Sequence, residues 1–242
     1  MSRVLAVIPA RHDATRFPGK PLALINGREM ILRVAERAAR CEKIDDVLVA
    51  ADDERILRVV RDGGFKGVMT SRSHASGMDR VAEAARDSDA EIVVNLQGDE
   101  PLMDPPSVDR AIEPLLSDAA LNVSTLATPI TDLKAFNDPN VVKVVFDDFH
   151  NALYFSRAPI PHNRDGRPSA PMFKHLGLYV YRREFLIKFS RMKPGVLEQT
   201  EMLEQLRILQ NGVKIRVVPT DKDSVGVDTP DDLKRAEAML DA

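Results

Sequence analysis

The fold is decided near the start of the chain, in Val4-Leu5-Ala6-Val7-Ile8-Pro9-Ala10-Arg11-His12-Asp13-Ala14-Thr15-Arg16-Phe17-Pro18-Gly19-Lys20. Its first five residues are apolar and predict a buried strand. The residues that follow carry proline, glycine and three cations, and they predict a loop. A loop at the carboxyl end of an N-terminal strand is where open α/β sheets bind ligands. Arginine and lysine at this place favour an anion with several oxygens, such as a nucleoside triphosphate.

Apolar strands and amphipathic helices alternate through the first hundred residues. The patterns predict strands over 4–8, 47–51, 67–69 and 92–96, and helices over 30–38, 54–60 and 79–85. Because helices separate the strands, a mostly parallel, doubly wound sheet with right-handed crossovers is expected.

The second half of the chain is less regular. The patterns predict strands over 123–128, 142–146, 152–156, 176–181 and 215–218, a loop over 158–171, a helix over 201–210 and a last helix that Thr229 caps and Pro230 begins. No repeat, low-complexity tract or linker divides the sequence. One domain over residues 1–242 is therefore expected.

The composition argues against several classes of protein. The formal net charge is −3 at pH 7, so a general surface for polyanions is not indicated and nucleic acid is not expected as a partner. Cys41 is the single cysteine, which excludes an intramolecular disulfide and is typical of a reducing compartment. No signal segment and no apolar run of membrane-spanning length is found. A cytoplasmic protein without membrane insertion is expected.

The loop from Arg11 to Lys20 has two interpretations. It is either a cradle for phosphate oxygens or a solvated surface loop with ordinary charges. Its position after the first strand, and its Pro18-Gly19-Lys20 end, favour the cradle. The glycine spacings of the P-loop and of the dinucleotide fingerprint are both absent, which argues against a P-loop enzyme and a redox Rossmann enzyme.

Two carboxylates are candidates for a metal site. Asp99, in Gln97-Gly98-Asp99-Glu100-Pro101, suits Mg²⁺, which prefers carboxylate oxygens with phosphate and water; a turn in which the aspartate bonds its own backbone explains it equally well. Asp228 alone is better explained by charge stabilisation of the following helix. Together the two acids form a pair that can grip a metal ion on a triphosphate.

Other polar residues favour structural roles. Asp52-Asp53-Glu54 ends a strand, but a helix N-cap explains it better than a ribose ligand, since no glycine fingerprint accompanies it. The histidines lack the spacing of a zinc site, and His175 considered alone is best explained as a structural histidine. No G-x-S-x-G sequence indicates a serine hydrolase.

Six stretches carry a joint pattern that runs nearly from end to end: residues 9–22, 95–101, 152–157, 175–179, 201–207 and 227–230. This pattern resembles that of the CMP-Kdo synthetases, the 3-deoxy-manno-octulosonate cytidylyltransferases. The resemblance implies a three-layer α/β/α, Rossmann-like nucleotidyltransferase fold with a mixed, mostly parallel sheet. It also implies activation of Kdo, an acidic sugar of lipopolysaccharide, by CTP to give CMP-Kdo and pyrophosphate.

The same resemblance implies a cofactor and a partner. The family is typically a cytoplasmic homodimer that uses Mg²⁺, with the dimer contacts and the sugar pocket mainly in residues 120–210. Two departures from the family pattern are Ser73 and Met78, which stand where aspartate and threonine are common. The alternatives are the same reaction on 8-amino-Kdo or another acidic sugar, as in CMP-sialic-type synthetases, and a non-catalytic nucleotide-binding protein.

Residue roles are also implied by the resemblance. The catalytic set consists of the triphosphate-binding cations Arg11 and Lys20 and the metal-binding acids Asp99 and Asp228. The nucleotide-binding set comprises Ala10, Arg11, Lys20, Thr70, Ser76 and Gly77. The residues expected to bind the acidic sugar are Arg16, Gln97, Arg157, Arg164, His175, Tyr179, Glu204 and Gln205.

Overall fold

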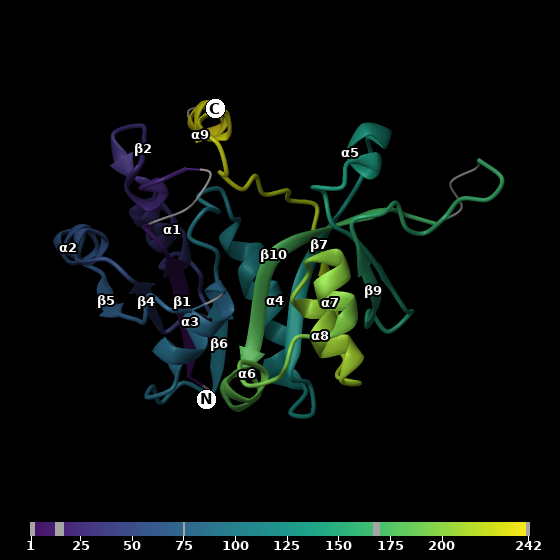
Figure 1. Cartoon of the computed structure of the whole chain (residues 1–242), viewed down its shortest axis with the longest axis horizontal. Coiled ribbons are helices and arrows are strands. Elements are labelled where there is room, and N and C mark those ends of the chain that lie inside the picture. Colours follow the sequence, from purple (N-terminus) through teal and green to yellow (C-terminus); the bar gives the residue numbers. More distant parts are fainter. Residues whose placement is uncertain (1–2, 13–16, 75, 167–169, 241–242) are drawn as a thin grey trace.

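A mixed sheet with helices on both faces forms the body of the protein in a computed structural model, which describes residues 3–12, 17–74, 76–166 and 170–240 (Figure 1). The strands are β1 (Val4–Ala10), β4 (Asp46–Ala51), β5 (Lys66–Met69), β6 (Ile92–Asn95), β7 (Val123–Pro129), β8 (Lys143–Phe146), β9 (Ala152–Ser156), β10 (Phe173–Arg182) and β11 (Ile215–Pro219). A small separate hairpin pairs β2 (Leu24–Ile25) with β3 (Arg28–Glu29).

The helices are α1 (Met30–Ala38), α2 (Glu54–Asp62), α3 (Gly77–Ala85), α4 (Pro105–Ser117), α5 (Leu133–Asn137), α6 (Arg183–Phe189), α7 (Val196–Glu201), α8 (Gln205–Gln210) and α9 (Pro230–Leu240). A short 3₁₀ turn, η1 (Lys20–Leu22), follows the basic loop. Among the described residues, no helix combines the length and the apolar character needed to cross a membrane.

The sheet is mixed and mostly parallel, in the order β11-β7-β10-β6-β1-β4-β5. The pairs β11/β7, β6/β1, β1/β4 and β4/β5 are parallel, and only β10 runs antiparallel to both of its neighbours on this path. Strands β8 and β9 extend from β10 as an antiparallel pair. The α/β fold expected from the sequence is therefore confirmed.

The core has two parts, one on each face of the sheet, and β1 contributes to both. Ala6 and Ile8 pack with α1, α2 and α4 on one face, whereas Leu5 and Val7 pack with α3, α6 and α8 on the other. Successive side chains of a strand point to opposite faces, so a continuous apolar strand is buried on both sides. This alternation produces the three layers.

One prediction for the second half was wrong, and one predicted strand is confirmed but longer than expected. The helix expected over 201–210 is two short helices, because Met202 takes a left-handed conformation (φ 53°) between α7 and α8. The strand expected over 176–181 is longer, and its pairing with β7 shifts between Leu176 and Tyr179. Tertiary contacts override the local pattern at both places: Leu203 is buried, and Gly177 lies against Gln97.

Two substantial helices had no sequence prediction. Helix α4 contains Pro105, Pro106 and Pro114, and proline in a sequence usually predicts the end of a helix. The helix forms because Asp104 caps it, accepting a hydrogen bond from the backbone N–H of Ser107, and because Pro105 and Pro106 lie in the first turn, where proline is tolerated. Pro114 lies inside the helix, where the burial of residues such as Val108 and Leu115 outweighs its cost. Helix α6 directly continues β10, so no loop signal separates the two.

Candidate active site

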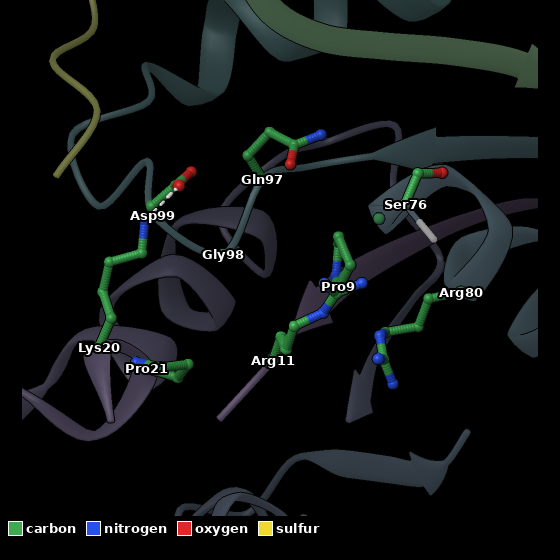
Figure 2. A pocket seen from close by; sticks show the side chains of 11 residues that line it. Pro9, Arg11, Lys20, Pro21, Ser76, Arg80, Gln97, Gly98 and Asp99 are labelled. Carbon is green, nitrogen blue, oxygen red and sulfur yellow. Dashed lines mark hydrogen bonds and ion pairs between the residues drawn. The ribbon is translucent and has the colours of Figure 1, made fainter. Parts of the chain in front are cut away.

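The polar stretches singled out in the sequence meet at one edge of the sheet. Strands β1 and β6 are parallel neighbours, so their carboxyl ends lie together. A cavity of about 240 Å³ opens there (Figure 2). It is lined by Pro9, Ala10, Arg11, Lys20, Pro21, Ser76, Gly77, Arg80, Gln97, Gly98 and Asp99. Parallel sheets place ligand sites at this edge, as the sequence predicted.

Lys20 lies between the two candidate metal ligands. Its Nζ donates to Oδ2 of Asp99 at 2.7 Å and to Oδ1 of Asp228 at 3.2 Å. Burial lowers the pKa of the ammonium, but the carboxylates of Asp99 and Asp228 outweigh this effect, and the net shift is upward. Lys20 is therefore a fixed positive charge at the mouth of the cavity.

Asp228 reaches this site from the far end of the sequence. The segment between β11 and α9 runs back along the carboxyl edge of the sheet toward β1 (Figure 1). The backbone N–H of Val227 donates to the carbonyl of Asp99 at 2.8 Å, which fastens this segment beside the loop after β6. Two acids separated by more than a hundred residues thus share one cation.

The paired carboxylates fit a divalent metal ion. Asp99 and Asp228 both contact the Lys20 ammonium, so the structure already places them around a single positive charge. Mg²⁺ is usually held by one or two carboxylates and completes its octahedron with phosphate oxygens and water. No group of three or more His, Cys, Asp or Glu gathers within the described residues. Further ligands to such an ion would come from a bound phosphate and from water.

Gly98 is required by the close approach of two loops. A Cβ atom at Gly98 would lie 2.6 Å from the carbonyl oxygen of Pro9, which is backbone and cannot move aside. Only glycine lets the loop after β6 lie this near to the end of β1. The Gln97-Gly98-Asp99 sequence thereby sets Asp99 beside the basic loop.

Arg11 and the start of helix α3 form the opposite wall. Arg11 donates to the backbone carbonyl of His74 at 2.7 Å. Ser76 caps α3 by accepting from the N–H of Asp79 at 3.3 Å, and Gly77 begins the helix. The N-terminus of a helix favours anions, because its first N–H groups have no helical partner. This wall is suited to phosphate oxygens.

Thr70 does not line the cavity; it contacts Arg80, which does. It is buried, and its hydroxyl donates to the carbonyl of Ala51 at 3.0 Å while it accepts from Arg80. Of the six residues expected to bind nucleotide, the other five line the cavity.

Two of the residues expected to bind the sugar are aromatic neighbours on β10, one buried and one partly buried. The rings of His175 and Tyr179 lie 5.3 Å apart on β10, and Tyr179 pairs in register with Asn95 of β6. The hydroxyl of Tyr179 is buried without a hydrogen-bond partner. An unsatisfied buried hydroxyl is costly, so a ligand that hydrogen-bonds to it would gain free energy.

His175 is held as a neutral imidazole. Burial, assisted by Lys174, lowers its pKa to about 3. Its Nε2 lies 2.9 Å from the hydroxyl of Thr125, and that hydroxyl donates to the carbonyl of Leu178 at 2.6 Å. Since a hydroxyl has one proton to give, the arrangement is satisfied when His175 donates through Nε2.

Gln97 and Glu204 connect the sugar residues with the cavity. Gln97 donates through Nε2 to Oδ1 of Asn95 at 3.2 Å and lines the cavity. Glu204 is hydrogen-bonded to Ser76; burial raises the pKa of this glutamate, and the hydrogen bond opposes the shift. Gln205 begins α8 immediately after it and is buried.

Two of the residues expected to bind the sugar, Arg157 and Arg164, are not gathered with the others. Arg157 donates to the backbone carbonyls of Glu201 at 2.7 Å and Pro139 at 3.0 Å, so its guanidinium fastens chain segments together. Arg164 is exposed, in a segment before β10 that projects away from the sheet on the side far from β1 (Figure 1). Arg16 lies outside the described residues.

The comparisons with known proteins agree with this geometry. Residues 5–215 match the Cytidylyltransferase family. The 3-deoxy-manno-octulosonate cytidylyltransferase of Geotalea daltonii is 51% identical over 248 residues and covers 98% of each chain. The enzyme of that name from Solibacter usitatus is 49% identical, over 99% of this chain and 95% of its own. This chain belongs to the 3-deoxy-manno-octulosonate cytidylyltransferase family.

Solved structures show that this chain has the fold of the family. A CMP:2-keto-3-deoxy-manno-octonic acid synthetase complexed with CTP superposes with a TM-score of 0.95 at 41% identity, over 99% of each chain. The 4-diphosphocytidyl-2C-methyl-D-erythritol synthase of Anaerococcus prevotii, at 16% identity and a TM-score of 0.66, shares the fold alone. The family expected from the motif pattern is confirmed.

The two departures from the family pattern have different surroundings. Met78 is buried in the core between α3 and the sheet, where an apolar side chain packs well. Ser73 is at the surface, and its hydroxyl lies 2.7 Å from that of Ser71. Neither side chain lines the cavity.

Sequence reasoning missed several residues at the cavity. Pro9, Pro21, Gly98 and Arg80 line it, and Asn95 holds Gln97. The signal for Gly98 was its place after a buried strand beside an acid. Arg80 had no local signal, since it is the fourth residue of an ordinary amphipathic helix.

Proposed function

We propose that this protein transfers the cytidylyl group of CTP to Kdo, giving CMP-Kdo and pyrophosphate. The observation that carries the proposal is the cavity at the sheet edge, where Arg11 and Lys20 face Asp99 and the start of α3. Two comparisons support the proposal. The sequence is 51% identical to that of a curated 3-deoxy-manno-octulosonate cytidylyltransferase, and the structure superposes on a CTP-bound synthetase with a TM-score of 0.95.

The reaction needs positioning and charge neutralisation more than covalent chemistry. The anomeric hydroxyl oxygen of the sugar forms a bond to the α-phosphorus of CTP, and the bond from that phosphorus to the bridging oxygen breaks. Pyrophosphate leaves with the electron pair, and the hydroxyl proton passes to the surrounding base or water. Arg11 and Lys20 stabilise the negative charge that grows on the phosphate oxygens.

We propose Mg²⁺ as the cofactor, held by Asp99 and Asp228. When bound, it would supply Lewis acidity at the phosphates and help to orient the leaving group. The carboxylates are suited to this task because each contacts the same cationic group, Lys20, at the cavity mouth. With a metal present, the Lys20 ammonium is free to turn to the phosphate oxygens.

The acidic sugar would bind on the β10 side of the cavity. Gln97, Tyr179, His175 and Glu204 supply hydrogen-bonding groups there; Tyr179 is buried and the other three are partly buried. Arg16, Arg157, Arg164 and Gln205 remain proposed members of this set. A sugar carboxylate is recognised best by a bidentate guanidinium, which makes Arg157 and Arg164 its candidate partners, with Arg16 as a further residue on the sugar side.

We also propose a cytoplasmic homodimer that acts in lipopolysaccharide biosynthesis. The dimer contact would involve residues 120–210, where Leu133, Leu153, Val196 and Met202 are exposed apolar side chains. Exposed apolar groups of this size favour burial against a partner.

The deciding experiment is a product assay. The protein is mixed with CTP, Mg²⁺ and Kdo, and the product is identified by mass, with ATP, GTP and UTP as nucleotide controls and 8-amino-Kdo as the sugar control. CMP-Kdo and pyrophosphate are expected in equal amounts, and only with CTP. Turnover with another nucleotide but not with CTP contradicts the proposal; preference for 8-amino-Kdo reassigns the sugar.

A further inference from the structure

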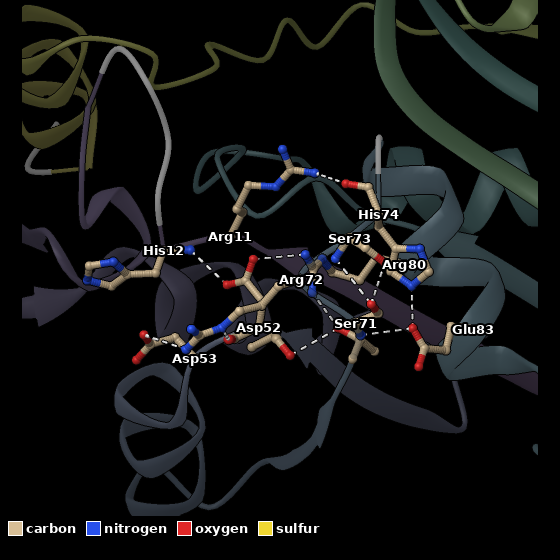
Figure 3. A network of polar contacts seen from close by, with 12 residues as sticks. Arg11, His12, Asp52, Asp53, Ser71, Arg72, Ser73, His74, Arg80 and Glu83 are labelled. Atoms are coloured by element: carbon tan, nitrogen blue, oxygen red, sulfur yellow. Dashed lines mark hydrogen bonds and ion pairs between the residues drawn. The ribbon is translucent and has the colours of Figure 1, made fainter.

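A buried ion pair lies behind the cavity wall and joins four segments of the chain. Arg80 of α3 donates through NH2 to Oδ2 of Asp52 at 2.9 Å (Figure 3). Arg80 is 1% exposed, and Asp52 is 7% exposed. A fully dehydrated pair of this kind stabilises a fold weakly, because both charges lose their hydration. Its presence beside the site therefore calls for another explanation.

Asp52 uses both carboxylate oxygens on groups that belong to the cavity. Its Oδ1 accepts from the backbone N–H of His12 at 3.0 Å, directly after Arg11 in the basic loop. Its Oδ2 accepts from Arg80, whose side chain lines the cavity. One carboxylate thus fixes the backbone of the loop and the guanidinium in the opposite wall.

Helix capping does not explain Asp52. The N-cap of α2 is Asp53, whose carboxylate accepts from the N–H of Arg55 at 2.9 Å. The sequence interpretation of Asp52-Asp53-Glu54 as a cap is therefore right for Asp53 only. Asp52 is left to face the cavity wall.

The same network holds Arg11 at its guanidinium and at the backbone that follows it. Asp52 holds the backbone that follows it, and the carbonyl of His74 accepts from its NH2 at 2.7 Å. His74 is in turn fastened to Glu83 of α3, which also accepts from the N–H of Ser71 at 3.1 Å. The loop before α3 is thereby tied to the helix that carries Arg80.

Electrostatics adds a reason for a carboxylate at this position. Arg11 and Arg80 are near enough for their charges to repel, and burial together with this repulsion lowers the pKa of Arg80, while Asp52 opposes the shift. Two neighbouring guanidiniums need a compensating anion. Asp52 supplies it from behind the wall, where it does not compete with a bound phosphate.

We propose that Asp52 is a positioning residue for nucleoside triphosphate binding: its carboxylate holds the basic loop and Arg80 in place before the nucleotide arrives. Cations that are already in position bind a polyanion more tightly, because no binding free energy is lost in rearranging the loop and the side chains. The inference rests on the proposed function, because it takes the cavity as the triphosphate site.

The test is Asp52→Asn, with kinetics and CTP binding measured separately. Asparagine keeps the size of the side chain, but both partners of Asp52 are donors and an amide cannot accept from both without turning its NH₂ group toward one. We expect the KM and the calorimetric Kd for CTP to rise about tenfold and the KM for Kdo to stay within twofold of wild type.

Glu198→Gln is the matched control, since it makes the same change in an equally buried ion pair away from the cavity. Glu198 pairs with Arg207 between α7 and α8, with Oε2 2.6 Å from Nε of Arg207. We expect it to lower the melting temperature as Asp52→Asn does, with the KM for CTP unchanged. A merely structural role for Asp52 predicts that the two variants behave alike.

Asp52→Glu serves if Asp52→Asn does not fold. Glutamate keeps the negative charge beside Arg80, but its extra methylene displaces the carboxylate that Asp52 holds against the N–H of His12 and the guanidinium of Arg80. A rise of about threefold in the KM for CTP is expected.

The outcomes separate the two hypotheses. If the wild type turns over CTP and Kdo but Asp52→Asn binds CTP normally, or Asp52→Glu does when that variant must stand in, the positioning role is refuted. If the wild type binds CTP and releases no pyrophosphate with any sugar, the proposed function fails, and the binding comparison still decides the positioning role. If the wild type does not bind CTP, both fail.

Discussion

The nucleotide side and the sugar side of this site are built differently. The nucleotide side consists of the loops after β1 and β6 and the segment around Asp228, which meet because parallel strands end at one edge. The sugar side consists of the middle of β10 and the junction of α7 with α8. There an antiparallel strand with a shifted register and a left-handed residue place the side chains.

The difference lies in how each side holds its polar groups. On the nucleotide side, charges are matched by charges: Lys20 contacts two carboxylates, and Asp52 contacts Arg80. On the sugar side, polar groups are dehydrated and largely neutral, such as His175 and the hydroxyl of Tyr179. We infer that activity depends mainly on the charged groups of the nucleotide side. On the sugar side we infer that it depends mainly on how the side chains pack. Four experiments sharpen or break this contrast.

The largest effect is expected from Asp99→Asn and Asp228→Asn. Each removes one of the two proposed metal-binding carboxylates, and kcat should fall about a thousandfold, which is about 4 kcal/mol. Calorimetry should show that CTP binding survives in part, because Arg11 and Lys20 remain. Asp221→Asn, at an exposed position earlier in the segment that carries Asp228, is the control and should keep the wild-type rate. Normal rates in both site variants would remove the metal assignment.

Lys20→Met comes next. It keeps most of the apolar stem but removes the charge and leaves Asp99 and Asp228 without their shared partner. The kcat/KM for CTP should fall about a hundredfold, measured by pyrophosphate release. An unchanged kcat/KM would show that this cation does not serve the phosphates.

Acid should destabilise the protein through His175. Its pKa in the folded state is about 3, below the ordinary value of 6.5, because burial disfavours the charged imidazole. Below pH 6.5 the unfolded chain therefore binds a proton that the folded chain does not. The stability that depends on neutral His175 is full above that pH and is lost as the pH falls. Between pH 7 and pH 5 the loss should be about 2 kcal/mol.

Urea unfolding at the two pH values measures this contribution. His175→Gln, which removes the titrating group, should show a pH dependence smaller by about 2 kcal/mol. His162→Gln, at an exposed position in the segment before β10, should behave as wild type. Equal pH dependence in all three proteins would mean that His175 titrates normally in the fold.

The smallest effects separate two arginines of the sugar side. Arg157→Ala should lower the free energy of unfolding by about 1 kcal/mol, because its guanidinium donates to backbone carbonyls that lose their partner. Arg164→Ala should leave stability unchanged and raise the KM for Kdo a few-fold, as the loss of an exposed carboxylate partner would. The reverse pattern would exchange the roles of the two residues.

Much of the nucleotide side was predictable because its signals are local. An apolar strand followed by a basic loop predicts a ligand site, and a second apolar strand, β6, is followed by the acidic stretch Gln97-Gly98-Asp99. The sugar side was less predictable. The helix expected over 201–210 breaks at Met202, and Arg157 is engaged by main-chain carbonyls, because packing between distant segments decides both.

The sequence by itself determined the α/β fold, the family and the residue types at the phosphate edge. Those properties follow from strand and loop patterns that neighbouring residues carry. Only the tertiary structure decided that Asp228 shares Lys20 with Asp99, that Asp52 faces Arg80, and that Gly98 lets two loops touch. These contacts join residues far apart in the chain, and no local pattern records which distant partner a buried charge will meet.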